Sequence, residues 1–316
     1  MKHAFLVSLA AILLTLLLTM LHTDTTAPPQ SAAPLTDSGI RFTVKTEEGI
    51  VTADMASYLP GVLAGEMPAL FESEALKAQA VAARTYILYR MAHGSAAHPE
   101  ADICNNAACC KAYADPAMLQ SRWGKQYDQY LQKITTAVTE TDGGYLTYGD
   151  APIEAVFHSS SAGATESSGA IWNDRAYLVS VASPETAADV PDYVSTVDFT
   201  PDELRQSLLT ADSTLTFSDN PALWISDVTC TNSGRVDRVT VCGQRMSGAA
   251  LRKALGLRST AFTVSYDGSF TFTVTGYGHG VGMSQYGANV FAKQGMDYRG
   301  ILAHYYPNTQ LTSAAG

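Results

Sequence analysis

The chain has 316 residues, of which 46% are hydrophobic and 16% are charged, a composition typical of a globular protein with a sizeable core. Its 30 acidic residues outnumber its 20 basic residues and give a formal net charge of −10. This charge would repel phosphate backbones and anionic lipid surfaces, so we expect no nucleic acid partner.

Residues 4–21 form an uncharged, apolar run close behind Lys2. Its length is about that of a helix that spans the hydrocarbon core of a bilayer. A cleaved secretory signal peptide is the alternative, but its apolar region is normally shorter and ends in small residues, whereas His22 follows here. We therefore predict that residues 1–22 are a cytoplasmic tip and a single-pass anchor in the cell membrane. Both interpretations place the rest of the chain outside the cytoplasm.

Residues 23–39 are rich in Pro, Ala, Ser and Thr and lack apolar periodicity, which predicts a flexible linker. Residues 40–312 combine strand-like alternation with helical spacing of apolar residues. The expected fold class is α+β: an N-terminal membrane-anchor helix, followed by an ectodomain of helices and antiparallel sheet. We expect its two lobes to enclose a substrate groove.

The first elements of this domain have local sequence signals. Alternation over residues 40–54 predicts a hairpin, and Asp54 is expected to start a helix. Pro68 should end that helix, and Ser73 should cap a second helix over residues 74–91. The buried stripe expected on the second helix consists of Leu76, Ala80, Ala83, Ile87 and Met91.

Two ionisable residues of these helices have mainly apolar neighbours in the sequence. Glu66 lies in VLAGEMPALF, where desolvation would raise its pKa and make it a proton donor near neutral pH. The alternative is a glutamate at a frayed helix end that faces water. Arg84 lies in AVAARTY and needs a carboxylate, a phosphate or a sugar hydroxyl as partner, unless it extends to the surface.

Three of the five cysteines lie close together. Cys104, Cys109 and Cys110 follow His98 in the spacing His-x5-Cys-x4-Cys-Cys. One imidazole and three thiols suit a closed structural zinc site, although the spacing is not a standard finger pattern. Outside the cytoplasm a disulfide is the alternative, and the residues alone leave both open.

Strands are expected to dominate after Thr139, and two short helices are expected to close the domain. The expected strands include residues 155–159, 177–181, 238–242 and 270–276, and the expected helices cover residues 284–295 and 298–306. Cys230 and Cys242 flank a predicted hairpin at positions too far apart for a disulfide.

Two loops carry candidate binding residues. His158 and Ser159 lie where a strand enters a loop rich in Ser, Gly and Thr, which suits either contact with sugar hydroxyls or an ordinary polar loop. Residues 276–289, GYGHGVGMSQYGAN, lack the spacing of phosphate-binding loops. Their glycines predict a surface that a ligand approaches closely, and the alternative is a tightly packed turn in which His279 bonds only to backbone.

Five segments, in this order, resemble the stage II sporulation protein D family, also called the amidase enhancer family. They are residues 59–88, 98–113, 157–167, 254–262 and 276–289. The resemblance extends from about residue 40 to Leu311. It implies a catalytic domain that acts as a peptidoglycan lytic transglycosylase in forespore engulfment, on glycan strands already stripped of stem peptides. It also implies a peptidoglycan amidase, an endopeptidase and a membrane scaffold as partners.

The resemblance implies that Glu66 is the catalytic acid. It would protonate the oxygen between N-acetylmuramic acid (MurNAc) and N-acetylglucosamine (GlcNAc). As a carboxylate it would then take the proton of the muramoyl C6 hydroxyl while that oxygen closes onto C1, which yields a 1,6-anhydro end. The residues expected to bind the glycan are Arg84, His158, Ser159, Tyr277, His279, Gln285 and Tyr286.

In some members of this family the pattern His-x5-Cys-x4-His-Cys-Gln-Ala-Tyr holds zinc. Here Cys109 replaces the second histidine and Lys111 replaces the glutamine. Because cysteine is also a zinc ligand, we expect structural zinc on three cysteines and His98, and no organic cofactor. Two other functions remain open: a non-catalytic glycan-binding activator of a cell-wall amidase, and a zinc hydrolase, which needs an open coordination position.

Overall fold

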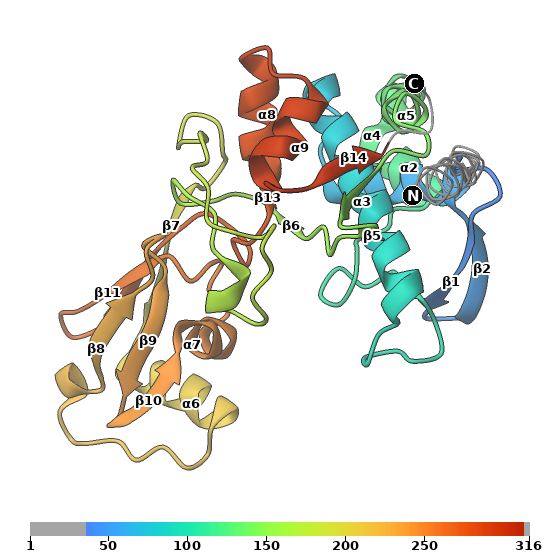
Figure 1. Ribbon diagram of the computed structural model, residues 1–316. Coiled ribbons are helices and arrows are strands. Elements are labelled where there is room, and N and C mark those ends of the chain that lie inside the picture. The colour runs from blue at the N-terminus through green and yellow to red at the C-terminus, as the bar shows by residue number, and fades with distance from the viewer. Residues whose placement is uncertain (1–35, 313–316) are drawn as a thin grey trace, which may run out of the picture. The chain divides into compact units, whose positions relative to one another are not determined.

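The computed structural model describes residues 36–312 (Figure 1). The predicted anchor, residues 1–22, lies outside these residues. Between residues 36 and 312, no helix combines the length and apolar character that crossing a membrane requires.

The described residues mix helices with small sheets, in agreement with the predicted α+β class. The helices are α2 (Met55–Glu66), α3 (Ser73–His93), α4 (Pro116–Trp123), α5 (Tyr127–Thr139), α6 (Pro201–Ala211), α7 (Gly248–Leu255), α8 (Gln285–Lys293) and α9 (Tyr298–Tyr305). The strands are β1 (Arg41–Thr46), β2 (Gly49–Asp54), β3 (Ile103–Cys104), β4 (Tyr145–Tyr148), β5 (Ala151–Pro152), β6 (Phe157–His158), β7 (Val194–Phe199), β8 (Ile225–Cys230), β9 (Val236–Val241), β10 (Gln244–Ser247), β11 (Phe262–Tyr266), β12 (Phe270–Thr275), β13 (Met283–Ser284) and β14 (Gln310–Thr312).

The predicted local signals set the ends of α2. Asp54 caps the helix by accepting a hydrogen bond from Ala56 N at 3.1 Å. The helix ends at Glu66 because Met67, which precedes Pro68, has an extended backbone. The predicted hairpin is also present, as strands β1 and β2 pair antiparallel. The cap expected at Ser73 is off by one residue, since Glu72 occupies that position and makes no side-chain cap bond.

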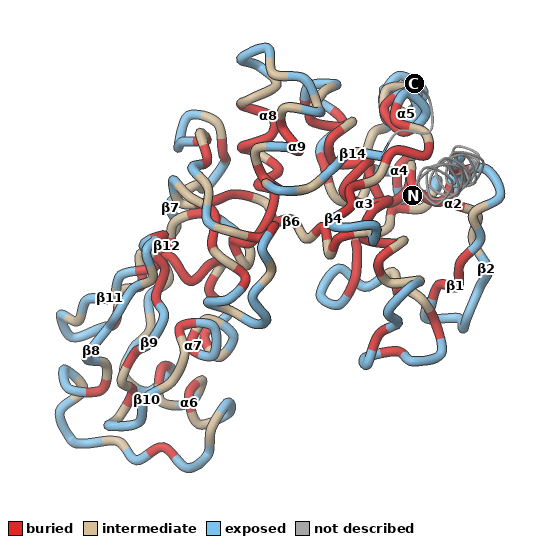
Figure 2. The backbone as a smooth tube through the Cα atoms, in the orientation of Figure 1, coloured by how far each residue is buried: buried red, intermediate tan, exposed pale blue. Residues whose placement is uncertain are grey.

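Helix α3 lies at the centre of the larger of two hydrophobic clusters, and helices α2, α5, α8 and α9 pack against it. Leu76, Ala80, Ala83 and Ile87 of the predicted stripe are fully buried, while Met91 is only partly buried. Figure 2 shows this cluster as red segments around α3.

Arg84 is also fully buried on α3, and its partner is a carboxylate of the protein itself. Its Nη2 lies 2.7 Å from Asp37 Oδ2, and its Nη1 donates to Gly144 O at 2.8 Å. The prediction that Arg84 lines the glycan groove is therefore wrong, because the ion pair holds it in the core. Asp37 falls within the predicted linker, but its buried side chain makes it part of the domain.

The second hydrophobic cluster is formed by β7 to β12 with α6 and α7, around Trp224, Phe270 and Phe272. Its two antiparallel sheets have the strand orders β11-β12-β7 and β10-β9-β8. The expected strands at 238–242 and 270–276 belong to it, as β9 and β12. No strand forms at 177–181, because this segment meets residues 163–168 through scattered hydrogen bonds, such as Thr165 N to Val181 O at 2.8 Å.

The short parallel pair of β6 and β13 joins two distant parts of the chain. Phe157 pairs with Met283, and His158 pairs with Ser284. Figure 1 shows β6 and β13 near the start of α8, between the elements of the α3 cluster and those of the second hydrophobic cluster. This pairing places residues 157–159 beside the start of α8, as Tyr286 N also donates to Ser159 O at 3.0 Å.

Candidate functional site

A cleft of about 1160 Å³ opens where α2, α3, the loop after β3, the β6 segment, residues 277–279 and the start of α8 meet. Eight of the residues singled out from the sequence line it: Glu66, Cys109, Cys110, His158, Ser159, Tyr277, His279 and Gln285. The cleft thus brings together residues from segments that lie far apart in the sequence.

Glu66 is the last residue of α2 and is half-buried in the wall of the cleft. Its Oε1 accepts a hydrogen bond of 2.7 Å from Ala112 N. Burial raises the pKa of Glu66 above its ordinary value, although the Lys111 ammonium, the Ala112 N–H and the Gln285 amide oppose this shift. Glu66 is therefore a fixed, partly desolvated acid and not a frayed helix end.

Gly65 allows this position of Glu66. A Cβ at residue 65 would lie only 3.1 Å from the carbonyl carbon and oxygen of Ala112. The absence of a side chain lets the end of α2 approach segment 112–114, which supplies the hydrogen bond to Glu66.

Lys111 lines the cleft, although the sequence analysis did not single it out as functional. Its side chain is almost completely buried, and Nζ lies 4.0 Å from the ring centroid of Tyr86 and 3.7 Å from that of Phe157. Burial lowers the pKa of Lys111 to about 8, while the negative charge of Glu66 opposes the shift. The available signal was a charged residue in place of the glutamine of the zinc pattern.

Glu154 is a second carboxylate in the cleft, and sequence analysis also missed it. Its Oε2 lies 3.6 Å from Arg175 Nη2. This contact places the carboxyl group of Glu154 beside a guanidinium at the wall of the cleft.

His158 is buried, and both of its ring nitrogens have protein partners. Nδ1 donates to Val281 O at 3.2 Å, which leaves Nε2 to accept from the Ser161 hydroxyl at 2.7 Å. Burial lowers the pKa of His158 well below its ordinary value, so the ring is neutral. His158 therefore lines the cleft with its ring but offers no free nitrogen to a ligand.

His279 is also neutral, since burial lowers its pKa to about 3. Its Nδ1 accepts from Val281 N at 3.1 Å, so its proton is on Nε2. Trp172 meets the imidazole edge to face at 5.5 Å between ring centroids. Tyr277, two residues earlier, is exposed at the rim of the cleft.

The four alternating glycines of this loop serve close packing against the protein. Gly276, Gly278, Gly280 and Gly282 all have positive φ. A Cβ at Gly278 would clash with His158, and one at Gly280 would clash with the guanidinium of Arg235. The glycines therefore fit the loop onto neighbouring segments, whereas we expected them to bring its backbone close to a ligand.

Gln285 and Tyr286 begin helix α8 but point in different directions. Gln285 is buried in the wall of the cleft. Tyr286 does not line the cleft; its ring packs edge to face on Phe71 with 4.9 Å between centroids. Its predicted place in the groove is wrong because successive helical residues point about 100° apart.

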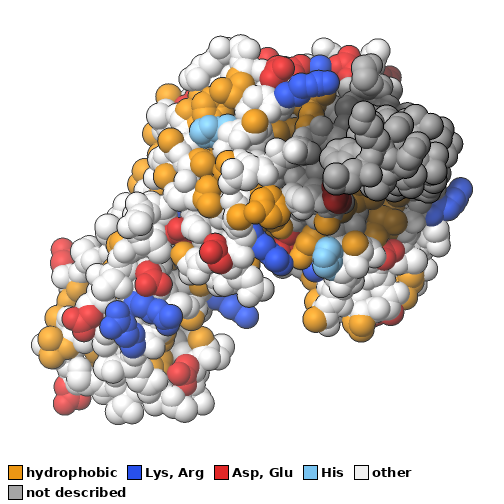
Figure 3. Space-filling view, viewed as in Figure 1, with side chains coloured by type: hydrophobic (Ala, Val, Ile, Leu, Met, Phe, Trp, Pro, Cys, Tyr) orange, Lys and Arg blue, Asp and Glu red, His pale blue; other side chains and the backbone are white. Residues whose placement is uncertain are grey.

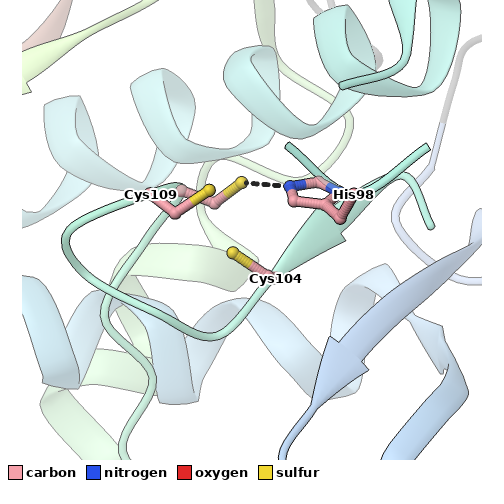
Figure 4. A group of neighbouring side chains, drawn as sticks. His98, Cys104 and Cys109 are labelled. Carbon is pink, nitrogen blue, oxygen red and sulfur yellow. Dashed lines mark hydrogen bonds between the residues drawn. The ribbon is translucent and has the colours of Figure 1, made fainter. Parts of the chain in front are cut away.

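The four predicted metal ligands do come together. The ligand atoms of His98, Cys104, Cys109 and Cys110 all lie within 4.8 Å of one another, and Figure 4 shows the labelled side chains converging. All five cysteines of the chain lie in the described residues and none forms a disulfide. The prediction that Cys230 and Cys242 form no disulfide is confirmed.

The chemistry of this cluster fits zinc. His98 Nδ1 donates to Ala101 O at 2.9 Å, which orients Nε2 toward Cys110 Sγ at 3.1 Å (Figure 4). Although burial alone would raise it, hydrogen bonds from Cys104 and His98 lower the pKa of Cys110 to about 7, which favours the thiolate. A set of one histidine and three cysteines supplies the four ligands of a closed tetrahedral site.

Residues 44–148 match the model of a protein family described as Stage II sporulation protein. The chain therefore carries a domain typical of a class of sporulation proteins. It is 39% identical over 271 residues to Stage II sporulation protein D of Bacillus subtilis (strain 168), a match that covers 84% of this chain and 77% of the relative.

The protein of the same name from Bacillus amyloliquefaciens is 39% identical over 264 residues, which are 82% of this chain and 74% of the relative. The Amidase enhancer of Bacillus subtilis (strain 168) is 30% identical over 315 aligned residues, covering 81% of this chain and 40% of that protein. The chain belongs to the stage II sporulation protein D family, and the resemblance seen in its motifs is confirmed.

Proposed function

We propose that this protein is a lytic transglycosylase that cleaves the MurNAc-GlcNAc bond of peptide-stripped peptidoglycan strands to 1,6-anhydroMurNAc ends during forespore engulfment. The observation that carries the proposal is Glu66, a partly desolvated carboxyl group fixed in the wall of a large cleft. Membership in the stage II sporulation protein D family supports the sporulation context.

One carboxyl group serves both steps of this reaction. Protonated Glu66 gives its proton to the glycosidic oxygen, and the bond from that oxygen to C1 of MurNAc breaks. The Glu66 carboxylate then takes the proton of the C6 hydroxyl as the C6 oxygen bonds to C1. Ala112 N–H holds the carboxyl group in place through both steps, and Gln285 supports it from α8.

We also propose that His98, Cys104, Cys109 and Cys110 hold a structural zinc ion. Zinc would fix the loop from Cys104 to Cys110, which leads directly to Lys111 and Ala112 beside Glu66. With four protein ligands the ion has no position for a catalytic water, which disfavours the zinc hydrolase.

We propose a single-pass anchor at residues 4–21, with the catalytic domain outside the cytoplasm. The apolar length of that segment supports it. A cell-wall amidase, an endopeptidase and a membrane scaffold are proposed partners, while the net charge of −10 disfavours nucleic acid.

The second candidate is a non-catalytic glycan-binding protein that activates a cell-wall amidase. It is favoured by the similarity to a protein named Amidase enhancer. Glu66 separates the two functions, because an activator does not need a proton donor in its cleft.

The test is mass spectrometry of peptide-free glycan strands incubated with the full chain in detergent, beside its Glu66→Gln variant. Anhydro-muramoyl ends made by the first protein and not by the second are the expected result. Ordinary reducing ends would indicate a hydrolase that uses water. Binding of the strands without any cleavage by the unaltered protein would favour the activator.

A further inference from the structure

The cleft has a charge opposite to that of the whole chain. Its charged lining residues are four basic ones, Arg90, Lys111, Arg175 and Arg252, and two acidic ones, Glu66 and Glu154. The chain as a whole has an acidic excess of ten charges. On the face shown in Figure 3, acidic and basic side chains are interspersed. An excess of basic groups inside a cleft of an acidic protein favours an anionic ligand there.

Three of these basic groups lie along one face of the cleft, around Tyr86 and Tyr89 of α3. Lys111 Nζ is 4.0 Å from the ring centroid of Tyr86, and Arg90 Cζ is 5.5 Å from the same centroid. Arg175 Nη2 donates to Tyr89 OH at 3.2 Å, which places it beside the same helix.

These groups have unused hydrogen-bond donors. Lys111 is 5% exposed, and among residues 36–312 its Nζ contacts the rings of Tyr86 and Phe157 but forms no hydrogen bond or ion pair. In the same part of the chain, the Nε atoms of Arg90 and Arg175 are buried without a partner. Glu154 lies 3.6 Å from Nη2 of Arg175, but it does not use these buried donors. Because buried charged donors are costly unless an acceptor binds them, the three groups favour a ligand that carries an anionic acceptor.

If the cleft binds a glycan, as in the proposed function, its unused cationic donors favour a sugar that carries an acidic group. In muramic acid the lactyl group ends in a carboxyl group. This carboxyl is an uncharged amide while a stem peptide is attached, and it is a free carboxylate once the peptide has been removed. Charge at this one position therefore distinguishes a stripped strand from a peptide-bearing one.

We propose that Lys111, with the Nε–H groups of Arg90 and Arg175, binds the free lactyl carboxylate of MurNAc and thereby selects peptide-stripped strands. This inference rests on the proposed function and names the residue that determines its specificity. Lys111 is the central group because it is the most buried of the three and lies next to Ala112, which holds Glu66. A carboxylate bound to Lys111 would lie in the same cleft as the proton donor, next to the backbone segment that holds it.

The test measures binding in the Glu66→Gln background, so that cleavage does not follow binding. The probes are a GlcNAc-MurNAc tetrasaccharide with free lactyl carboxylates and the same sugar with those carboxylates converted to methylamides. The full chain in detergent is titrated with each probe by calorimetry. The variants are Lys111→Gln, Lys111→Arg and, as a matched control that removes the same charge from the exposed surface of α7, Lys253→Gln.

We expect the free acid to bind about 10-fold or more tightly than the methylamide, as for a charge-assisted hydrogen bond. Lys111→Gln should reduce the ratio of the two dissociation constants, methylamide to free acid, to near 1. Lys111→Arg and Lys253→Gln should keep most of this ratio. An unchanged ratio in Lys111→Gln overturns the inference, and so does equal binding of both probes by the parent protein. Cleavage is compared separately with the protein that retains Glu66. If it cleaves stripped strands and methylamide strands equally, the proposed selection of the free carboxylate is rejected, while the lytic reaction is upheld. Binding of neither probe would reject the proposed function itself.

Discussion

The backbone N–H of Ala112 donates a hydrogen bond of 2.7 Å to the Glu66 carboxyl group. Ala112 is two residues beyond Cys110, so the end of the cysteine loop is also the support of the proposed catalytic acid. The cluster of His98 and three cysteines is thus joined to the acid by two residues of backbone, so we expect the position of Glu66 to depend on the integrity of the cluster.

Removal of one metal ligand should therefore impair both stability and cleavage. We expect Cys104→Ser to lose bound zinc and to lower the melting temperature by roughly 5 °C or more, as loss of a structural metal site costs a few kcal/mol. Zinc content by elemental analysis and thermal unfolding check this. Cys230→Ser, at an exposed position of β8, is the control and should keep zinc, stability and activity. Full cleavage and unchanged melting in a zinc-free protein would contradict the prediction.

Because the pKa of Glu66 is raised, both the cleavage rate and the contribution of Glu66 to stability should fall as the pH rises. Cleavage requires the protonated acid, so its rate should fall as the pH rises through the raised pKa. Stability should also fall as the pH rises from the ordinary value of 4.5 through the raised pKa, because the unfolded chain releases this proton more readily. Burial keeps His158 and His279 neutral in the folded protein across this range, so neither should add a step near pH 6.5 to the cleavage rate. Their lowered pKa values act on stability with the opposite sign to that of Glu66, because the imidazoles of the unfolded chain bind protons as the pH falls below 6.5.

Glu66→Gln isolates the stability effect. The neutral amide should raise the melting temperature at pH 7 and leave it unchanged at pH 3, where Glu66 is protonated in both the folded and the unfolded state. Thermal unfolding at the two pH values measures this. A lower melting temperature of the variant at pH 7 would show that the ionised carboxylate stabilises the fold.

Arg84 should matter for stability and not for glycan contact. Arg84→Met leaves Asp37 buried and unpaired, and we expect a loss of about 3–5 kcal/mol in the free energy of unfolding, measured with urea. Arg205→Met breaks an exposed pair with Asp202 and should cost about 1 kcal/mol or less. A variant at residue 84 that keeps full stability but loses glycan cleavage would restore Arg84 to the glycan site.

Glu154→Gln tests whether the second carboxylate of the cleft takes part in the chemistry. We expect the variant to release the same anhydro-muramoyl ends as the unaltered protein, since Glu66 alone transfers both protons in the proposed reaction. Mass spectrometry of the products gives the answer. Loss of cleavage in this variant, together with reducing ends from the unaltered protein, would assign Glu154 as the base of a hydrolase.

Features with a local cause were predictable from the sequence. Asp54 and Pro68 set the ends of α2 through a side-chain cap and a steric restriction. The two closing helices were found as α8 and α9, and Gly295 follows the first with φ of 91°. The cysteine cluster assembles as predicted because its ligands are close in sequence, with His98 brought beside them.

Features that depend on distant partners were not predictable in the same way. Composition predicted a linker at Asp37, and only the fold shows that its carboxylate meets Arg84. The direction of Tyr286 depends on the position of Phe71, more than 200 residues earlier. Lys111 replaces the glutamine of the zinc pattern, but this difference does not predict its burial between Tyr86 and Phe157, which arises from tertiary packing.

The parallel pairing of β6 with β13 also determines how much of the chain must be synthesised before the cleft can form. His158 meets Ser284, so a long stretch of chain must be closed into a loop before Gln285 reaches Glu66. A chain still being synthesised contains Glu66 early but has no cleft until synthesis has passed α8. The order of residues along the chain thus delays the assembly of the cleft until α8 has been synthesised.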